Sequence, residues 1–222
     1  MSRLASNRPF LAGLAVALLT WAFIQISSEM VEGDTRAFDL EVAHAAQSLR
    51  INFPWIAEVM RDLSGLGSTV VLTLFTLAAV GYLEVVRARM TALLVAAAVI
   101  SGTAGVNLLK AFFGRPRPDA GFAEVVATGM SFPSGHATNS AIVFLTVAAL
   151  LAGTRTRAME QYYIVAIAIL MALLVGLSRI ALGVHWATDV LAGWALGAAW
   201  ALTWWLLARR LSQESLGMVN TT

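Results

Sequence analysis

The stretch Tyr162–Ser178, with the sequence YYIVAIAILMALLVGLS, contains no charged side chain. An α-helix needs about 20 mostly apolar residues to cross roughly 30 Å of hydrocarbon. Five further stretches are similarly apolar and approach that length: Phe10–Ser27, Ser68–Val86, Thr91–Phe112, His136–Ala152 and Thr188–Ala208. We therefore expect an all-α fold, a bundle of six transmembrane helices.

The composition agrees with a membrane protein. Hydrophobic residues make up 59% of the 222 residues and charged residues only 13%, whereas a soluble domain carries about 25% charged residues. Six spans use most of the chain, so residues 1–222 are expected to form a single membrane domain. The basic residues are scattered in pairs between apolar segments, a pattern that does not favour nucleic-acid binding. Cysteine is absent, which excludes disulfides, thiolate catalysis and Cys-based zinc sites.

The arginines predict the orientation of the bundle. They precede the first span, separate the second from the third and the fourth from the fifth, and follow the sixth: Arg3, Arg8, Arg87, Arg89, Arg155, Arg157, Arg209 and Arg210. The positive-inside rule places this end, with both termini, in the cytoplasm. The first span has the basic start of a signal peptide, but its apolar run is long and no convincing cleavage site follows, so we expect it to remain uncleaved.

The segment Asp39–Asp62 is too polar to be a span. Its apolar residues, among them Leu40, Ala43 and Leu49, recur at helical spacing with charged residues between them. We expect one or two amphipathic helices on the outer face of the bundle. Packing on the bundle as a lid is favoured over a role in shaping lipid access, although amphipathicity alone does not separate the two.

Two glycines of the sixth span, Gly193 and Gly197, form a G-x-x-x-G pattern. This pattern lets two helix backbones approach closely. The motif is short and each helix has several neighbours, so we expect close packing inside the bundle rather than dimerisation.

The remaining charges at membrane depth lie in three segments at the outer ends of spans, and ionisable groups there indicate function because they are costly. The first segment, KAFFGRPRP, contains Lys110, Arg115 and Arg117. Its two prolines hold the chain extended and so direct Arg117. Cations on a stiff turn suit an oxyanion. Snorkelling at a helix end would explain Lys110 alone, but not the proline-spaced arginines.

The second segment is Pro133-Ser134-Gly135-His136, just before the fourth span. Ser134 can cap the helix, and Gly135 lets a ligand approach the backbone. The free N–H groups and the positive end of the helix dipole favour an anion. His136 is placed to give a proton to a leaving oxygen. Considered alone, the segment fits an ordinary serine cap with an interfacial histidine equally well.

The third segment contains Arg179, His185 and Asp189. If His185 and Asp189 both lie on the start of the sixth span, their spacing of four places them on one face. The aspartate can then accept the N–H of one imidazole nitrogen and leave the other basic, which makes His185 a candidate nucleophile for phosphorus. A structural His–Asp pair is the alternative. The three segments together lack a metal-binding carboxylate cluster and fit metal-free phosphoryl transfer.

The three segments resemble the signature of the type 2 phosphatidic acid phosphatase (PAP2) superfamily, which is K-x6-R-P, then P-S-G-H, then S-R-x5-H-x3-D. Every position of the signature has its match here, in order and at the right spacing. The six-span layout also resembles the bacterial membrane members. The resemblance implies a membrane lipid phosphatase that needs no metal and no other cofactor.

The resemblance also implies residue roles. His185 would attack phosphorus and form a phosphohistidine, Asp189 would orient His185, and His136 would protonate the leaving group and then activate water. Five residues would hold the phosphate oxygens: Lys110, Arg117, Ser134, Gly135 and Arg179. Arg115 and His44 lie outside the signature, and no catalytic role is expected for them.

The implied substrate is a lipid phosphate of a bacterial inner membrane, with the site facing the periplasm. Candidates are undecaprenyl pyrophosphate, phosphatidylglycerophosphate, phosphatidic acid and a lipid A phosphate. Membrane lipids are the other expected partners, and neither a nucleic acid nor an obligate protein partner is indicated. A vanadate-dependent haloperoxidase resembles the family at the same pocket, but known relatives of that kind are soluble. A non-catalytic lipid-binding or transport protein would be expected to have lost signature residues, and none is missing.

Overall fold

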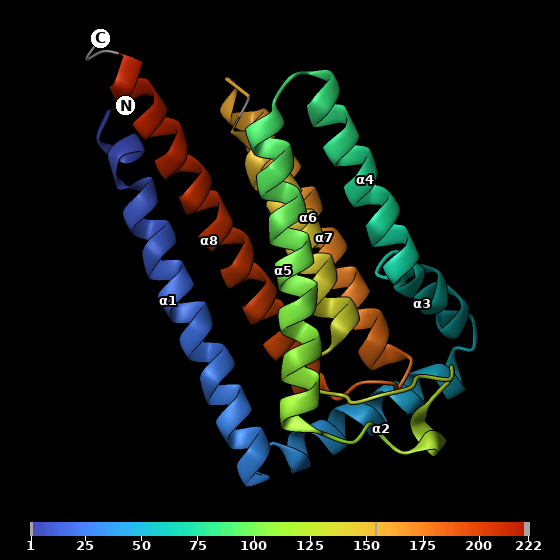
Figure 1. Cartoon of the computed structure of the whole chain (residues 1–222). Coiled ribbons are helices and arrows are strands. Elements are labelled where there is room, and N and C mark those ends of the chain that lie inside the picture. Colours follow the sequence, from blue (N-terminus) through green and yellow to red (C-terminus); the bar gives the residue numbers. More distant parts are fainter. Residues whose placement is uncertain (1, 154, 220–222) are drawn as a thin grey trace.

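The computed structural model describes residues 2–153 and 155–219, and within these ranges it is helical without strands (Figure 1). The all-α expectation is confirmed. In chain order the helices are α1 (Ser2–Glu32), α2 (Arg36–Asn52), α3 (Trp55–Gly65), α4 (Thr69–Val85), α5 (Arg89–Phe113), the short 3-10 helix η1 (Ala120–Phe122), α6 (Gly135–Ala152), α7 (Ala158–Ala181) and α8 (Ala187–Val219).

The long helices coincide with the predicted spans. Five of them, α1, α5, α6, α7 and α8, are individually long and apolar enough to cross a membrane. The 17 residues of α4 meet α3 at a bend of 42°, and the bent pair forms a sixth candidate span. Two helices extend well past the predicted limits. Helix α1 runs from Ser2 to Glu32, beyond Phe10–Ser27 at both ends, and α8 continues to Val219, beyond the predicted end at Ala208.

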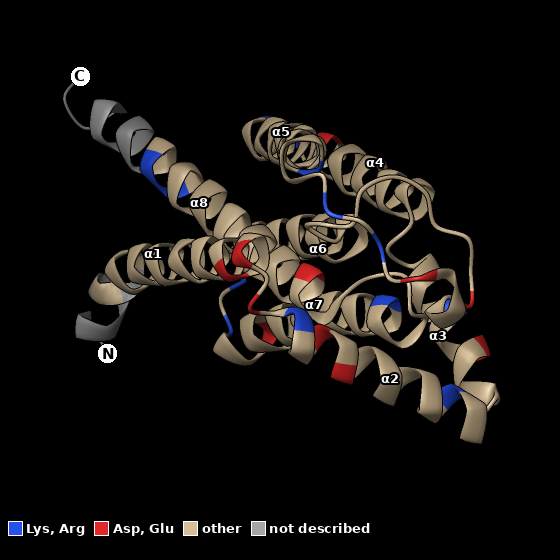
Figure 2. Ribbon diagram, turned by 90° about the horizontal axis from the view of Figure 1, so that it is seen from below, with Lys and Arg blue, Asp and Glu red and all other residues tan. Residues whose placement is uncertain are grey.

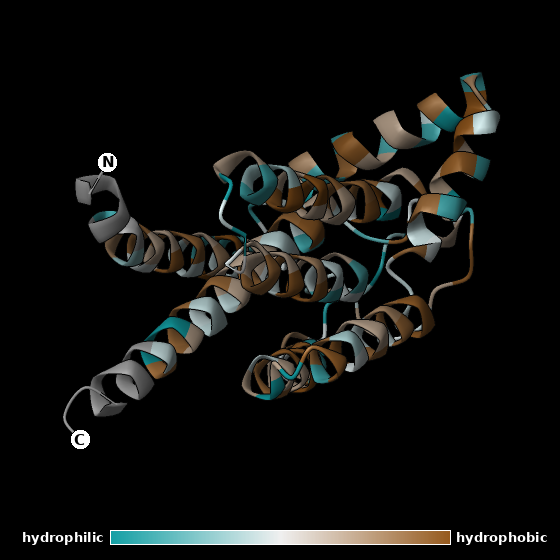
Figure 3. Cartoon of the chain, turned by 90° about the horizontal axis from the view of Figure 1, so that it is seen from above, coloured by the Kyte–Doolittle hydropathy of each residue, from teal (hydrophilic) through white to brown (hydrophobic). Residues whose placement is uncertain are grey.

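The central helix of the bundle is α6. Ten of its 18 residues are buried, and it packs against α8, α7 and α5, while α1 lies along α8. The buried core joins Val143 and Phe144 of α6 to Ala172 and Val175 of α7 and to Leu72 of α4. Many large apolar side chains of α1, α4 and α5 are exposed, and Figure 3 shows apolar residues along these helices. Such surfaces suit a bundle surrounded by lipid.

The G-x-x-x-G glycines allow α8 to approach α6. A Cβ added at Gly193 would lie 2.8 Å from the hydroxyl oxygen of Thr138. A Cβ added at Gly197 would lie 2.6 Å from the Cβ of Ala141 and 2.7 Å from the carbonyl oxygen of Thr138. Both glycines therefore face α6, in agreement with the expected packing inside the bundle.

The two ends of the bundle differ in character. The start of α1, the α4–α5 and α6–α7 connections and the end of α8 gather at one end, where the predicted cytoplasmic arginines lie (Figure 1). The opposite end is covered by α2 and the connections that follow α5 and α7. Seen from that opposite end, α2 lies along one side of the bundle, beside α7 and α3, and carries both acidic and basic residues (Figure 2).

The predicted amphipathic segment forms α2 and α3. Helix α2 packs against α7, α8 and η1, and α3 packs against α7. Two charged residues of α2, Asp39 and Arg50, are buried in these contacts. The segment therefore packs on the bundle, as the favoured interpretation of its sequence predicts.

Candidate active site

Four helix ends at the same end of the bundle as α2 carry the signature residues. Lys110 lies in the last turn of α5, and Arg179 lies in the last turn of α7. His136 is in the first turn of α6 and Asp189 in the first turn of α8. The carbonyl oxygen of Asp189 accepts the N–H of Ser134 at 2.9 Å, which joins the starts of α6 and α8. The fold thus brings three segments that are distant in sequence to one place.

His185 contacts both a carboxylate and a guanidinium. Its Nδ1 lies 3.2 Å from Oδ2 of Asp189, and Nη1 of Arg117 donates toward its Nε2 at 3.0 Å. His185 precedes the first residue of α8 by two positions, so the condition for a shared helix face is not met and the pair reaches from a loop into the helix. The loop depends on Gly183, which has a φ of 69° and where a Cβ would overlap the carbonyl oxygen of Phe122.

The charge state of His185 follows from its surroundings. Burial lowers the pKa of the imidazole to about 4, although the hydrogen bond and the negative charge of Asp189 act in the opposite direction. The ring is therefore neutral near neutral pH. A proton on Nδ1 that faces Asp189 leaves the lone pair on Nε2. This is the state that a nitrogen nucleophile requires.

The Asp189 carboxylate accepts hydrogen bonds from residues that the signature does not contain. Arg115 Nη1 donates to it at 2.6 Å, the N–H of Trp186 donates at 2.9 Å, and the hydroxyl of Ser131 also donates. Ser131 Oγ lies 3.3 Å from Nδ1 of His185 as well. Sequence reasoning missed Ser131 and set Arg115 aside. The available signal was their position, two residues before a signature segment and two residues before Arg117.

The side chains of Lys110 and Arg117 are oriented by hydrogen bonds to backbone carbonyl oxygens. Lys110 Nζ donates to the carbonyl oxygen of Met130 at 2.7 Å. Arg117 donates to the carbonyl oxygens of Val184, Gly129 and Thr128 at 2.8 to 3.0 Å. Burial lowers the pKa of Arg117, and the charge of Asp189 raises it. Neutral carbonyls orient these cations, so their positive charge remains available to an anion.

Two buried donors within the signature segments have no partner in the described structure. They are the hydroxyl of Ser134 and Nε of Arg179, and they make up half of the four unpartnered buried side-chain atoms in the described ranges. Ser134 precedes α6, where a serine can cap the helix, but its hydroxyl makes no cap bond. Arg179 Nη1 donates to Ser64 Oγ at 2.5 Å. Buried polar atoms without partners are rare, so we associate this pair with an anionic ligand.

His136 is the last of the eight signature residues, which together are called the cluster below. It is half-buried beside Gly67, where an added Cβ would lie 3.3 Å from the imidazole Cδ2. Its ring makes no hydrogen bond to the part of the chain that the structure describes, which leaves both nitrogens free for proton transfer. The backbone N–H groups of Gly135 and His136 lie in the first turn of α6, where no helix carbonyl can accept them. His44, for which no catalytic role is expected, makes an edge contact with the ring of Phe122.

Hydrogen-bond donors converge beside a neutral histidine at the end of a membrane-spanning bundle. This arrangement is that of a membrane phosphatase. The chain belongs to the PAP2 superfamily, whose profile matches residues 91–213. That range contains all eight residues of the predicted site.

Relatives of known identity extend the similarity to most of the chain. Phosphatidylglycerophosphatase B of Bacillus subtilis is 34% identical over 182 residues, 79% of this chain and 85% of that protein. Decaprenylphosphoryl-5-phosphoribose phosphatase of Mycobacterium tuberculosis is 33% identical over 163 residues, 72% and 85% of the two chains. The crystal structure of a transmembrane PAP2 type phosphatidylglycerolphosphate phosphatase from Bacillus subtilis matches with a TM-score of 0.79 at 28% identity and covers 90% of this chain and 96% of that chain.

Proposed function

We propose that this protein removes phosphate from a membrane lipid through a phosphohistidine intermediate on Nε2 of His185. The observation that carries the proposal is the pair of buried, unpartnered donors, Ser134 Oγ and Arg179 Nε, in the cluster that holds a neutral histidine. Together with the N–H groups that begin α6, they offer several donors to one anion. A phosphoryl group has the oxygens to accept them.

In the first half of the reaction, the lone pair on His185 Nε2 attacks phosphorus, and the bond from phosphorus to the leaving oxygen breaks. Asp189 accepts the Nδ1 proton in a hydrogen bond and stabilises the positive charge that develops on the ring. His136 gives a proton to the leaving oxygen. Arg117, which donates toward Nε2 at 3.0 Å, transfers that donor to a phosphate oxygen.

In the second half, His136 takes a proton from water as the water oxygen attacks phosphorus. The bond from nitrogen to phosphorus breaks, inorganic phosphate leaves, and His185 returns to its neutral form. Lys110, Arg117 and Arg179 neutralise the charge on the phosphoryl oxygens in both steps, so positioning and electrostatics supply most of the catalysis. No step of this scheme calls for a metal or another cofactor.

The substrate we propose is a lipid phosphate at the periplasmic face of a bacterial inner membrane. The site lies where membrane-spanning helices end, so a substrate can present its phosphate while its tail stays in lipid. Phosphatidylglycerophosphate, phosphatidic acid and undecaprenyl pyrophosphate are the first candidates, and the two curated relatives are named for glycerophospholipid and prenyl-linked substrates. A panel of these lipids, assayed for released phosphate in detergent, ranks them by kcat/KM.

The test of the mechanism is His185→Ala. We expect turnover to fall to background. We also expect a reaction with substrate radiolabelled in its phosphate, quenched under alkaline denaturing conditions that preserve phosphohistidine, to label the wild type but not the variant, because the attacking nitrogen is gone. His44→Ala is the control, since its ring contacts Phe122 and none of the cluster, and it is expected to retain activity. Chelators should leave the wild-type rate unchanged, and vanadate should inhibit it as a mimic of five-coordinate phosphorus. Substantial turnover by His185→Ala would overturn the proposal.

A further inference from the structure

Helix α2 contributes a buried carboxylate to the site from outside the family signature. The side chain of Asp39 is 1% exposed. Its Oδ1 accepts the N–H of Thr188 at 3.0 Å, and its Oδ2 accepts the Thr188 hydroxyl at 2.7 Å. Asp39 thus binds the start of α8 one residue before Asp189. A carboxylate at a helix N-terminus is favourably placed for the helix dipole.

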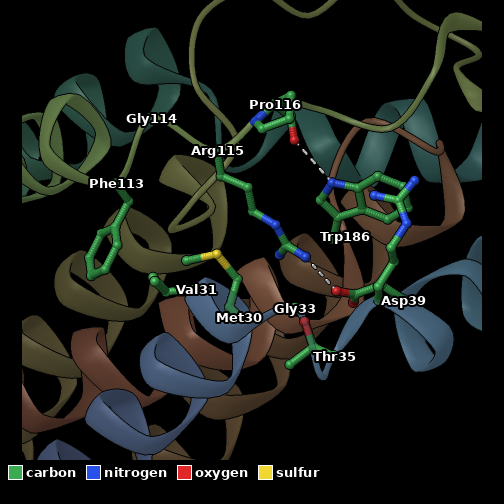
Figure 4. A pocket seen from close by; sticks show the side chains of 11 residues that line it. Met30, Val31, Gly33, Thr35, Asp39, Phe113, Gly114, Arg115, Pro116 and Trp186 are labelled. Atoms are coloured by element: carbon green, nitrogen blue, oxygen red, sulfur yellow. Dashed lines mark hydrogen bonds and ion pairs between the residues drawn. The ribbon is translucent and has the colours of Figure 1, made fainter.

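Arg115 bridges this carboxylate to the one beside the nucleophile. Its Nη2 donates to Asp39 Oδ2 and its Nη1 to Asp189 Oδ1, each at 2.6 Å. The guanidinium lies 5.6 Å from the centre of the Trp186 ring, and its side chain is 12% exposed. Figure 4 shows Arg115 joined to Asp39 at the edge of a cavity of about 350 Å³.

The bridge restricts the Asp189 carboxylate. Guanidinium donors have a fixed planar geometry, so Arg115 can satisfy both carboxylates only when Asp189 presents Oδ1 to it. Oδ2 then faces His185 Nδ1, the Trp186 N–H and the Ser131 hydroxyl. Without Arg115, the Oδ1 side of Asp189 would lose its charged donor, and the carboxylate could rotate away from the imidazole.

We infer that Arg115 and Asp39 are positioning residues that hold the Asp189 carboxylate and thereby aim Nε2 of His185 at phosphorus. The inference rests on the proposed function, because it assigns Asp189 the task of orienting the nucleophile. It adds two residues outside the signature to the catalytic arrangement. It also gives α2 a specific role in the chemistry, beyond covering the end of the bundle.

The competing explanation is that Arg115 and Asp39 only dock α2 on the bundle. Arg50 provides a matched comparison, because it docks the other end of the same helix. It donates to the carbonyl oxygen of Phe122 at 2.6 Å, to Glu124 at 3.2 Å and to the carbonyl oxygen of Ala181. It is buried, as Asp39 is, but it contacts neither His185 nor Asp189.

The first experiment measures kcat, KM and thermal unfolding for Arg115→Ala, Asp39→Asn and Arg50→Ala in the full-length protein. We expect Arg115→Ala to lower kcat about 10- to 100-fold, the size of a lost charge-assisted hydrogen bond, and to change KM little. Asp39→Asn should lower kcat less, because its amide oxygen still accepts the Thr188 N–H. Arg50→Ala should lower the unfolding temperature while kcat stays within about twofold. An equal loss of kcat in Arg50→Ala would show that docking alone matters and would overturn the inference.

The second experiment is a double-mutant cycle. If Arg115 acts through Asp189, Arg115→Ala should lower kcat less than about threefold further in an Asp189→Asn background. If the two substitutions lower kcat independently, so that their fold-losses multiply in the double variant, the inference is contradicted even if Arg115→Ala alone lowers kcat. The inactivity of His185→Ala is tested separately, so a failure of the proposed mechanism is distinguishable from a failure of the positioning role.

Discussion

His185 joins two properties that a nucleophile needs, a neutral ring and a fixed orientation. Burial provides the first, since it disfavours the charged imidazolium. Asp189 provides the second through the Nδ1 contact. The two effects act in opposite directions on the pKa, and burial is the larger of them. The residue is thereby kept neutral beside a carboxylate that would otherwise favour its charged form.

The lowered pKa of His185 gives a test by titration. The pKa is about 4 in the folded protein against 6.5 for an ordinary histidine, so between these values the unfolded chain binds a proton that the folded chain does not. The contribution of His185 to the free energy of unfolding is therefore fully present above pH 6.5 and is lost as pH falls from 6.5 through about 4. NMR of the protein with labelled histidines in detergent, assigned with single-histidine variants, should show the His185 signal titrating well below pH 6.5. A midpoint at the ordinary histidine value would contradict this.

The unpartnered hydroxyl of Ser134 gives a second test at the same scale. Ser134→Ala should lower kcat/KM about 10- to 100-fold, because a hydrogen bond to a charged ligand contributes about 1.5–3 kcal/mol. Thr146 is a matched control, since its hydroxyl is also buried and unpartnered on α6 but contributes nothing to the cluster. Thr146→Val should keep full activity and should not lower the unfolding temperature, because no hydrogen bond is lost. Equal activities for the two variants would remove Ser134 from phosphate binding.

At the scale of elements, the contact between α6 and α8 sets the geometry of the site. Helix α6 carries His136 and α8 carries Asp189, and the N–H of Ser134 binds the carbonyl oxygen of Asp189. The glycine face of α8 permits this close approach. Helix α2 packs against α7 and α8 and connects to the start of α8 through Asp39.

Because α6 and α8 lie so close together, adding a single methyl group between them should lower the stability of the protein. Gly197→Ala would place a methyl group 2.7 Å from the carbonyl oxygen of Thr138, so α6 and α8 must separate. We expect a loss of about 1–3 kcal/mol in stability, the range for overpacking, together with reduced activity. Gly105→Ala on α5 is the control, because its added Cβ would meet no atom within 4 Å. Thermal unfolding in detergent measures both variants, and equal unfolding temperatures would mean that the glycine is not needed for packing.

At the scale of the whole molecule, the arginine pairs and the site lie at opposite ends of the bundle (Figure 1). The positive-inside rule therefore predicts that the site lies outside the cytoplasm. The topology decides which leaflet of the membrane can supply the substrate, so it limits which lipids can reach the site.

The absence of cysteine makes the orientation simple to test. A single cysteine at Val126, which is 96% exposed in the connection between η1 and α6, should react with a membrane-impermeant maleimide in intact spheroplasts. A single cysteine at Thr156, exposed between α6 and α7, should react only after the membrane is permeabilised. The reverse pattern would place the site in the cytoplasm.

The sequence alone determined the helical spans and the signature residues, because both depend on local properties. A span is a continuous apolar run, and each signature segment is a short spacing at a helix end. Local spacing left two details open that the structure decides: the Ser134 hydroxyl is unpartnered and does not cap α6, and His185 lies before α8.

Only the tertiary structure decided what surrounds Asp189. Arg115 is 74 residues from Asp189 and 76 from Asp39, and Asp39 is 149 residues from Thr188. No periodicity or spacing encodes contacts at such separations. They arise because the end of α5 and the starts of α2 and α8 lie at the same end of the bundle, where buried charges must find partners.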